Sequence, residues 1–328
     1  MQNKKRPLLC NKRVFLVVDN NGFALFNSAL CLQGISEEIG AHIIVVATNS
    51  LVVSSNFKKN VLESNVFGLL KNAKPGDVIV FFSLGLQVLF SPVFRVRKIK
   101  TIYMYHEPCK LNERIAKTGK ILHGIVAHTL INILLKIVSE AVVLNPRRAT
   151  QLGYRQVQFP VLFADTIKTS FLKFPHLVFL GGQLKSRSVD LFRIVKDVLP
   201  SRLPGFQASF FPNGSDKSEI EKCRVLGEGR VVIWNLFTIE YNQSGVTLDG
   251  LMYGLPVLVN SRDMYASKIH DACPYCVFDI GNITVESVIL ALRSIYESYD
   301  FYRSNMRKLG GDLLTKESLI RSWMFITG

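Results

Sequence analysis

The residues best suited to chemistry lie in one stretch near residue 245 of the 328-residue chain. They are Glu240, Gln243, Ser244, Gly245 and Asp249, and an apolar-periodic helix is expected to begin at Ser244-Gly245. The first N–H groups of a helix have no intrahelical partner, and together with the helix dipole they attract anions. Gly245 permits close backbone approach, Ser244 offers a hydroxyl, and Asp249 offers a carboxylate for sugar hydroxyls. The spacing indicates a diphosphate site, with an ordinary capped helix as the alternative.

Positively charged residues stand in a second polar turn, between an apolar run and the next helical segment. They are Lys185 and Arg187, and Gly182 precedes them. Such cations can supply positive charge to a bound diphosphate. A solvated surface is the alternative, because charged residues in turns are common.

Polar residues also follow apolar runs in the first half of the chain. His106 and Glu107 come after the run from Ile99 to Tyr105, and Asn21 and Gly22 come after the first run. The carboxyl ends of parallel strands are where ligands bind in open α/β sheets. His106 is therefore expected where a ligand could bind, and a structural hydrogen bond within the His106-Glu107 pair is the alternative.

Short runs rich in Val, Ile and Phe alternate with helix-like segments in the first half. Continuous apolar strands are typical of a parallel sheet that is covered on both faces. The runs are Arg13 to Asp19, His42 to Thr48, Asp77 to Ser83, Ile99 to Tyr105 and Ala141 to Leu144. Helical spacing covers Ala24 to Ile39 and Val61 to Lys71. Repeated β-α units of this kind predict a Rossmann-like domain.

The alternation restarts in the second half. Strands are expected at His176 to Leu180, Phe206 to Phe211, Val231 to Leu236, Leu255 to Val259 and Tyr275 to Phe278. Helices are expected at Asp190 to Leu199, Gly245 to Tyr253, Val285 to Ser298 and Glu317 to Phe325. The sequence predicts an α/β protein with two Rossmann-like, doubly wound domains facing a cleft. They cover residues 1–172 and 173–328, with the last helix free to pack back on the first domain.

The chain is basic, with 40 Lys and Arg against 25 Asp and Glu and a formal charge of +15. This charge favours polyanions, including nucleotide phosphates, nucleic acid and anionic lipid. The basic residues are spread along the chain and no nucleic-acid motif accompanies them, so nucleic acid is not an expected partner.

Residues 121–138 form an apolar run that barely reaches the length of a membrane span. Its polar members are His123, His128, Asn132 and Lys136. Because these are costly in hydrocarbon, a mostly buried helix is expected instead. Lys117, Lys120 and Lys136 leave open a peripheral contact with an anionic membrane. No signal peptide is recognised, so the expected location is the cytoplasm, with the inner membrane face for a peripheral form.

Cys273 and Cys276 have the spacing of half a zinc site or of a redox pair. No second pair or histidine cluster stands near them in the sequence. Two half-buried cysteines flanking a turn are expected, without a metal.

The stretch from Gln243 to Val257 resembles the donor-site motif of GT-B glycosyltransferases, especially family 4. In that family two acids eight positions apart precede a small-residue helix that ends in Gly-x-Pro-Val. Asp249 matches the second acid, whereas Tyr241 stands at the first position with Glu240 beside it. The resemblance implies that Asp249 holds the nucleotide ribose and that the loop N–H groups up to Val246 hold the diphosphate.

Other segments resemble the same family. The turn with Gly182, Lys185 and Arg187 is similar to the family's Gly-Arg-Leu and Lys-Gly segment, whose cations neutralise the leaving diphosphate. His106-Glu107 resembles the strand-end His-Asp or His-Glu that contacts the donor sugar, which implies that His106 is a catalytic residue and Glu107 a helper. Asn21-Gly22 lies where the family places a loop near the donor phosphate and the acceptor.

The resemblance implies a retaining, metal-independent transferase that moves a sugar from a nucleoside diphosphate to a hydroxyl acceptor, with no cofactor besides the donor. A glycan or lipid-linked glycan of bacterial surface polysaccharide or lipopolysaccharide is the acceptor class it implies. Two alternatives stay open: a sugar-nucleotide epimerase of the same fold, and a non-catalytic sugar-nucleotide-binding or partner protein.

Overall fold

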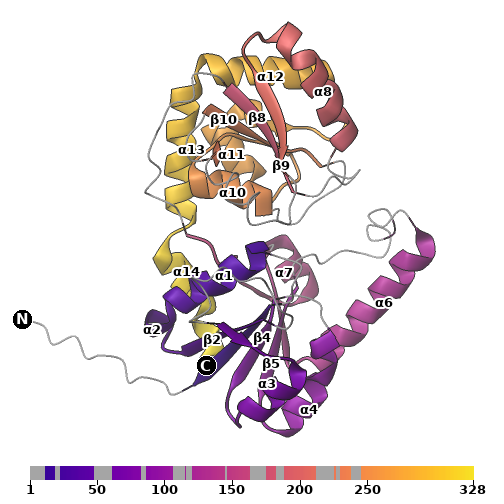
Figure 1. The fold of residues 1–328 in the computed structure, drawn as a ribbon, viewed down its shortest axis with the longest axis vertical. Helices are drawn as coiled ribbons and strands as arrows, with labels where there is room; N and C mark the ends of the chain where they lie inside the picture. The colour runs from indigo at the N-terminus through magenta and orange to yellow at the C-terminus, as the bar shows by residue number, and fades with distance from the viewer. Residues whose placement is uncertain are drawn as a thin grey trace, which may run out of the picture. The chain divides into compact units, whose positions relative to one another are not determined.

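The protein folds into two compact units in the computed structural model (Figure 1). The first comprises Met1–Val161 with Lys316–Gly328, and the second comprises Leu162–Thr315. The residues that the structure describes are 12–18, 23–47, 61–82, 86–105, 115, 120–144, 146–162, 175–181, 188–211, 225–226, 230–237 and 245–328. Residue 172, the expected domain boundary, lies outside them.

The first unit is built on a seven-stranded parallel sheet with strand order β3-β2-β1-β4-β5-β6-β7. Its strands are β1 (Arg13–Val18), β2 (His42–Ala47), β3 (Val61–Glu63), β4 (Val78–Phe81), β5 (Lys100–Tyr105), β6 (Glu140–Val143) and β7 (Arg155–Gln156). The central strands are apolar along their length because side chains on both faces are buried. The five strands expected from apolar runs are confirmed.

Helices connect these strands. They are α1 (Phe23–Gly34), α2 (Ser36–Ile39), α3 (Val66–Asn72), η2 (Leu86–Phe90), α4 (Ser91–Val96), α6 (Ile121–Ile137) and α7 (Pro146–Leu152). The helix expected over Val61 to Lys71 is wrong at its start, because Val61–Glu63 pairs with β2 as an edge strand. The helix begins only at Val66, where the Asn65 side chain accepts a hydrogen bond from the Gly68 N–H.

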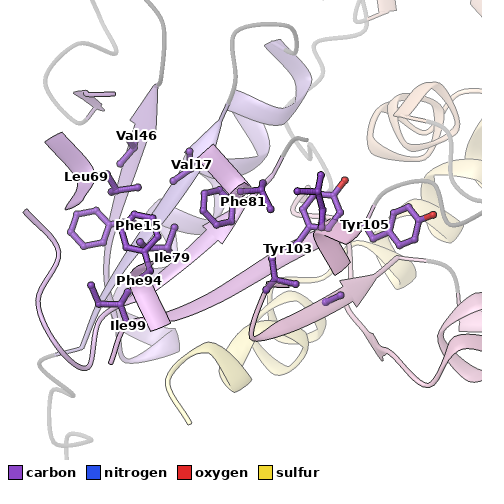
Figure 2. Packing of buried hydrophobic residues seen from close by; sticks show 14 of the residues in the cluster. Phe15, Val17, Val46, Leu69, Ile79, Phe81, Phe94, Ile99, Tyr103 and Tyr105 are labelled. Atoms are coloured by element: carbon purple, nitrogen blue, oxygen red, sulfur yellow. The ribbon is translucent and has the colours of Figure 1, made fainter. Parts of the chain in front are cut away.

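Side chains from α3, α4 and α6 share one apolar core with the sheet. Leu69 and Phe94 pack with Phe15 and Ile79 of the strands, as Figure 2 shows. The connections β3–β4, β4–β5 and β5–β6 all step in the same direction across the sheet. Right-handed crossovers therefore place α3, α4 and α6 on the same side of it.

Helix α6 is less buried than the sequence suggested. Only Gly124, Ile131 and Leu134 of its 17 residues are buried, so the expectation of a mostly buried helix is wrong. The run is apolar around most of its circumference, and such a pattern does not show which side faces the core.

The chain ends on the first unit, with α14 (Lys316–Trp323) and η5 (Met324–Ile326). The Trp323 ring stacks on Phe82 with 6.0 Å between ring centroids, and its Nε1–H donates to the Gln158 carbonyl at 2.8 Å. The Lys12 ammonium donates to the carbonyls of Thr327 and Gly328. These contacts hold the last residues of the chain on the first unit.

The second unit contains a five-stranded parallel sheet with strand order β12-β11-β10-β8-β9. The strands are β8 (Pro175–Leu180), β9 (Gln207–Phe211), β10 (Arg230–Asn235), β11 (Val257–Asn260) and β12 (Val277–Phe278). The helices are α8 (Val189–Arg202), α10 (Gly245–Tyr253), α11 (Ala266–Ala272), η4 (Pro274–Cys276), α12 (Val285–Glu297) and α13 (Tyr299–Leu313). All five expected strand regions hold a strand, but α11 and α13 were not expected.

Two details of the second unit correct the sequence expectations. The run from Tyr275 begins as a 3₁₀ turn, and only Val277–Phe278 pairs as a strand. Cys273 and Cys276 are fully buried, with their Sγ atoms 3.3 Å apart, rather than half-buried. Burial raises the pKa of the Cys276 thiol, which therefore stays protonated and unreactive at neutral pH.

Candidate functional site

The strand order of the second unit identifies the edge where a ligand is expected. The chain passes from β8 to β9 on one side and then returns to β10 on the other side of β8. The order therefore reverses between β8 and β10. In open α/β sheets ligands bind beside the carboxyl ends of the two strands at such a reversal.

The sequence motifs leave the sheet at these two strand ends. β8 ends at Leu180, and Gly181 follows with a φ of 88°, a conformation that suits glycine. The segment with Gly182, Lys185 and Arg187 comes next, and these three residues lie outside the described part of the chain. Glu240, Gln243 and Ser244 follow β10 and also lie outside it.

Helix α10 spans Gly245–Tyr253, the bounds that the sequence predicted. Val246, Thr247, Leu248, Gly250 and Leu251 are buried. Gly245 is exposed and Asp249, one turn later, is partly exposed. Residues four apart lie on the same side of a helix, so the two expected donor contacts share its open face. Val246 has its side chain in the core, which leaves its backbone as the group for a ligand.

Two glycines let the buried side of α10 pack closely on β11 and α13. A Cβ at Gly250 would come within 2.9 Å of the Val257 Cβ, so only glycine permits this approach to β11. Gly254 has a φ of 60° and packs on Arg307 of α13, whose Cα would lie 2.8 Å from an added Cβ. The Gly-x-Pro-Val ending thus has a structural reason: it turns the chain tightly from α10 into β11.

A chain of buried hydrogen bonds supports the first turn of α10. The Asn235 amide, at the end of β10, donates to the Thr247 hydroxyl at 2.7 Å. That hydroxyl donates to Asp263 Oδ2 at 2.9 Å, and the Tyr265 backbone N–H donates to Asp263 Oδ1 at 2.9 Å. The polar groups satisfy one another, and they join the end of β10, the start of α10 and the turn after β11.

The carboxyl group of Asp263 has an unusual environment. It is buried, and this burial raises its pKa to about 6 despite the hydrogen bonds from Tyr265 and Thr247. Asn260, at the end of β11, also stabilises this turn. Its side chain accepts a hydrogen bond from the Arg262 N–H and donates one to the Phe237 carbonyl. These residues position the turn beside α10.

None of Asn235, Thr247, Asn260 and Asp263 was singled out from the sequence. A signal existed for two of them, because Asn235 falls near the end of the expected strand Val231 to Leu236, and Asn260 follows the one from Leu255. A polar residue at the end of an apolar strand is a candidate for supporting a site. The partnership with Asp263 depends on the tertiary fold and leaves no local pattern.

The first unit has a corresponding reversal between β1 and β4. Asn21 and Gly22 follow β1, and His106 and Glu107 follow β5, one strand beyond β4. All four residues lie outside the described residues. Their strands end at the ligand-binding edge of this sheet, and their roles stay predictions.

No group of three or more His, Cys, Asp or Glu side chains that could hold a metal occurs in the part of the chain that the structure describes. Likewise, no helix among the described residues is both long and apolar enough to cross a membrane.

Two Rossmann-like units with parallel sheets define the fold class called GT-B, and the chain has this fold. Anabaena HepE in complex with UDP-glucose is similar over 94% of this chain and 97% of its own, with a TM-score of 0.65 and 10% identity. Sucrose-phosphate synthase from Thermosynechococcus elongatus is similar over 95% and 97%, with a TM-score of 0.63 and 9% identity.

A glycosyltransferase from Rickettsia africae is similar over 97% of this chain and 98% of its own, with a TM-score of 0.56 and 10% identity. The sequence matches no protein-family model and no curated protein sequence. Because the sequence identities are only 9 to 10%, these similarities establish the fold alone.

Proposed function

We propose that the protein is a retaining, metal-independent glycosyltransferase that moves a sugar from a nucleoside diphosphate to a hydroxyl acceptor. The proposed acceptor is a glycan or lipid-linked glycan of a bacterial surface polysaccharide. The reaction breaks the bond between the anomeric carbon and the diphosphate, forms a glycosidic bond to the acceptor oxygen, and releases the nucleoside diphosphate.

The observation that carries this proposal is the open face of α10 at the strand-order reversal. Gly245 is exposed at the amino end of the helix, and Asp249 is partly exposed one turn later on the same side. Backbone N–H groups and the helix dipole suit a diphosphate, and a carboxylate suits the two hydroxyls of a ribose. The Thr247 hydroxyl, which accepts from the Asn235 amide and donates to the Asp263 carboxylate, holds this end of the helix in place without a ligand.

The fold comparison supports the donor class. Anabaena HepE, a structural neighbour, is known in complexes with UDP-glucose and with UDP and glucose. We assign Lys185 and Arg187, which follow β8, to stabilising the charge that develops on the leaving diphosphate. This electrostatic role is the one that a metal ion fills in other enzymes, so the proposed reaction needs no metal.

The test is release of nucleoside diphosphate from a panel of sugar nucleotides, with and without lipid-linked acceptors, in buffer containing EDTA. Transfer that persists in EDTA and requires the acceptor is the expected result. Product with inverted anomeric configuration, seen by NMR, would contradict the retaining assignment. Activity that appears only when a divalent ion is restored would contradict metal independence.

Tyr241, at the position of the family's first acid, favours a second candidate: a protein that binds the sugar nucleotide without transferring the sugar. The same assay separates the candidates. Donor binding without turnover by any acceptor points to this second function, and isomerised sugar nucleotide points to an epimerase.

A further inference from the structure

Helix α6 exposes a wide apolar face. Leu122 is 73% exposed, Val126 56% and Ile133 50%, which is unusual for side chains of this size. Residues three and four apart share a side of a helix, so these three side chains and their neighbours form one face. The exposed large apolar residues of α6 are Ile121, Leu122, Ile125, Val126, Leu130 and Ile133.

The same side of the sheet carries further exposed apolar residues. Phe67 of α3 and Val93 and Val96 of α4 are exposed, and α3 and α4 lie on the side of the sheet that α6 covers. Arg95 of α4 donates to the carbonyls of Ile137 and Val138 at 2.8 and 2.9 Å. This contact fixes the carboxyl end of α6 beside α4, as Figure 1 also shows.

Charge on these segments has one sign. Residues 64–76, 86–99 and 120–139 contain no Asp or Glu. Their basic residues are Lys71, Lys74, Arg95, Arg97, Lys98, Lys120 and Lys136. Asp77, which follows the first segment, is buried and paired with Arg13 at 2.6 Å. Glu140, which follows the third segment, is paired with Lys100 at 2.9 Å and with Arg155 at 3.1 Å.

From this combination we infer that the α6 face, defined as the six exposed apolar residues of α6 with Lys120 and Lys136, docks on the surface of an anionic lipid bilayer. The helix lies in the plane of the interface, with its apolar side chains among the acyl chains and its lysines at the level of the phosphates. At 17 residues the helix is about 25 Å long. The α6 face is thus the surface for the peripheral membrane contact that Lys120 and Lys136 suggested from the sequence.

Charge also argues against a second copy of the chain as the occupant of this face. A second copy bound through the same surface would bring lysines against lysines with no acid to pair them, which is unfavourable. A lipid surface provides many phosphates at once and does not need matching geometry. Membrane docking can be tested independently of sugar transfer, because vesicle binding is measured without donor or acceptor.

The experiment is co-flotation of the full chain with phosphatidylglycerol–phosphatidylcholine vesicles and with pure phosphatidylcholine vesicles. The wild type is expected to float with the anionic vesicles, less so at high salt, and weakly with the neutral ones. Leu122→Gln with Val126→Gln should lower binding to anionic vesicles by at least about tenfold. Lys136→Gln should lower it by about fivefold.

The matched control places the same change on the other unit. Leu290 and Ile194 are 58% and 51% exposed on α12 and α8, so Leu290→Gln with Ile194→Gln should bind as the wild type does. Equal thermal midpoints would show that all variants are folded. Failure of the wild type to float, or equal loss in both double variants, would overturn the inference. A dimer in size-exclusion chromatography that Leu122→Gln dissociates, with no flotation, would overturn it in favour of a protein interface.

Discussion

Helices α10 and α6 each connect two neighbouring parallel strands and are both rich in apolar residues, but their surroundings are opposite. In α10 the apolar side chains are buried, and the small part left open carries Gly245 and Asp249. In α6 most of the large apolar side chains are exposed. Hydrophobicity alone therefore did not decide which helix is buried.

Small residues and polar partners account for the difference. Gly250 and Gly254 let α10 approach Val257 and Arg307 closely, and Thr247 bonds to groups on two other elements. Helix α6 has a single glycine, Gly124, which approaches Ile115 closely. A helix locked in this way is suited to hold a ligand, and a helix with an open apolar face is suited to meet a surface.

The largest expected effect contrasts a leucine in each helix. Leu251 of α10 is fully buried, so Leu251→Ala should lower the free energy of unfolding by about 2 to 5 kcal/mol. Leu122 of α6 is exposed, so Leu122→Ala should change it by no more than about 0.5 kcal/mol. Urea titrations of both variants check the pair, and similar losses would mean that α6 is packed against something in solution.

The second effect is a pH dependence of the free energy of unfolding, caused by Asp263, the buried partner of Thr247 in α10. The pKa of Asp263 is raised to about 6, so the folded state holds a proton between pH 4 and 6 that the unfolded chain has released. The free energy of unfolding therefore falls by about 3 kcal/mol as the pH rises from 4 to 6, and this contribution is lost above the folded pKa. Asp263→Asn should remove this fall. Parallel stability profiles of the two proteins from pH 4 to 7 would contradict the burial of an ionisable carboxyl here.

A smaller loss of stability is expected on removal of the Thr247 hydroxyl, which joins Asn235 to Asp263. Thr247→Val keeps the shape but leaves the Asn235 amide and the Asp263 carboxylate without this partner, which should cost about 2 kcal/mol of unfolding free energy. The exposed Thr129 of α6 is the matched control, and Thr129→Val should be nearly neutral. If donor affinity survives Thr247→Val unchanged, the network does not position the helix for binding.

The sequence predicted the parallel strands and the bounds of α10, because continuous apolar runs and glycine positions are local signals. It missed the short edge strand β3 and the exposure of α6, since both depend on what packs alongside. The bonds among Asn235, Thr247 and Asp263 join residues far apart in the chain, so no local pattern shows them. Of the expected site, the structure describes Gly245, Val246 and Asp249, and it places Gly245 and Asp249 on the open side of α10, while their roles in donor binding stay predictions.

The most direct test of the central claim is calorimetric titration of UDP-glucose and other sugar nucleotides against the wild type and Asp249→Ala. The exposed Asp312 of α13 provides the control, Asp312→Ala. At least one sugar nucleotide is expected to bind the wild type and the control equally. Loss of the Asp249 carboxylate should weaken that binding by about 1.5 to 3 kcal/mol, roughly ten- to a hundredfold. Unchanged affinity in Asp249→Ala would contradict the assignment of α10 as the donor site.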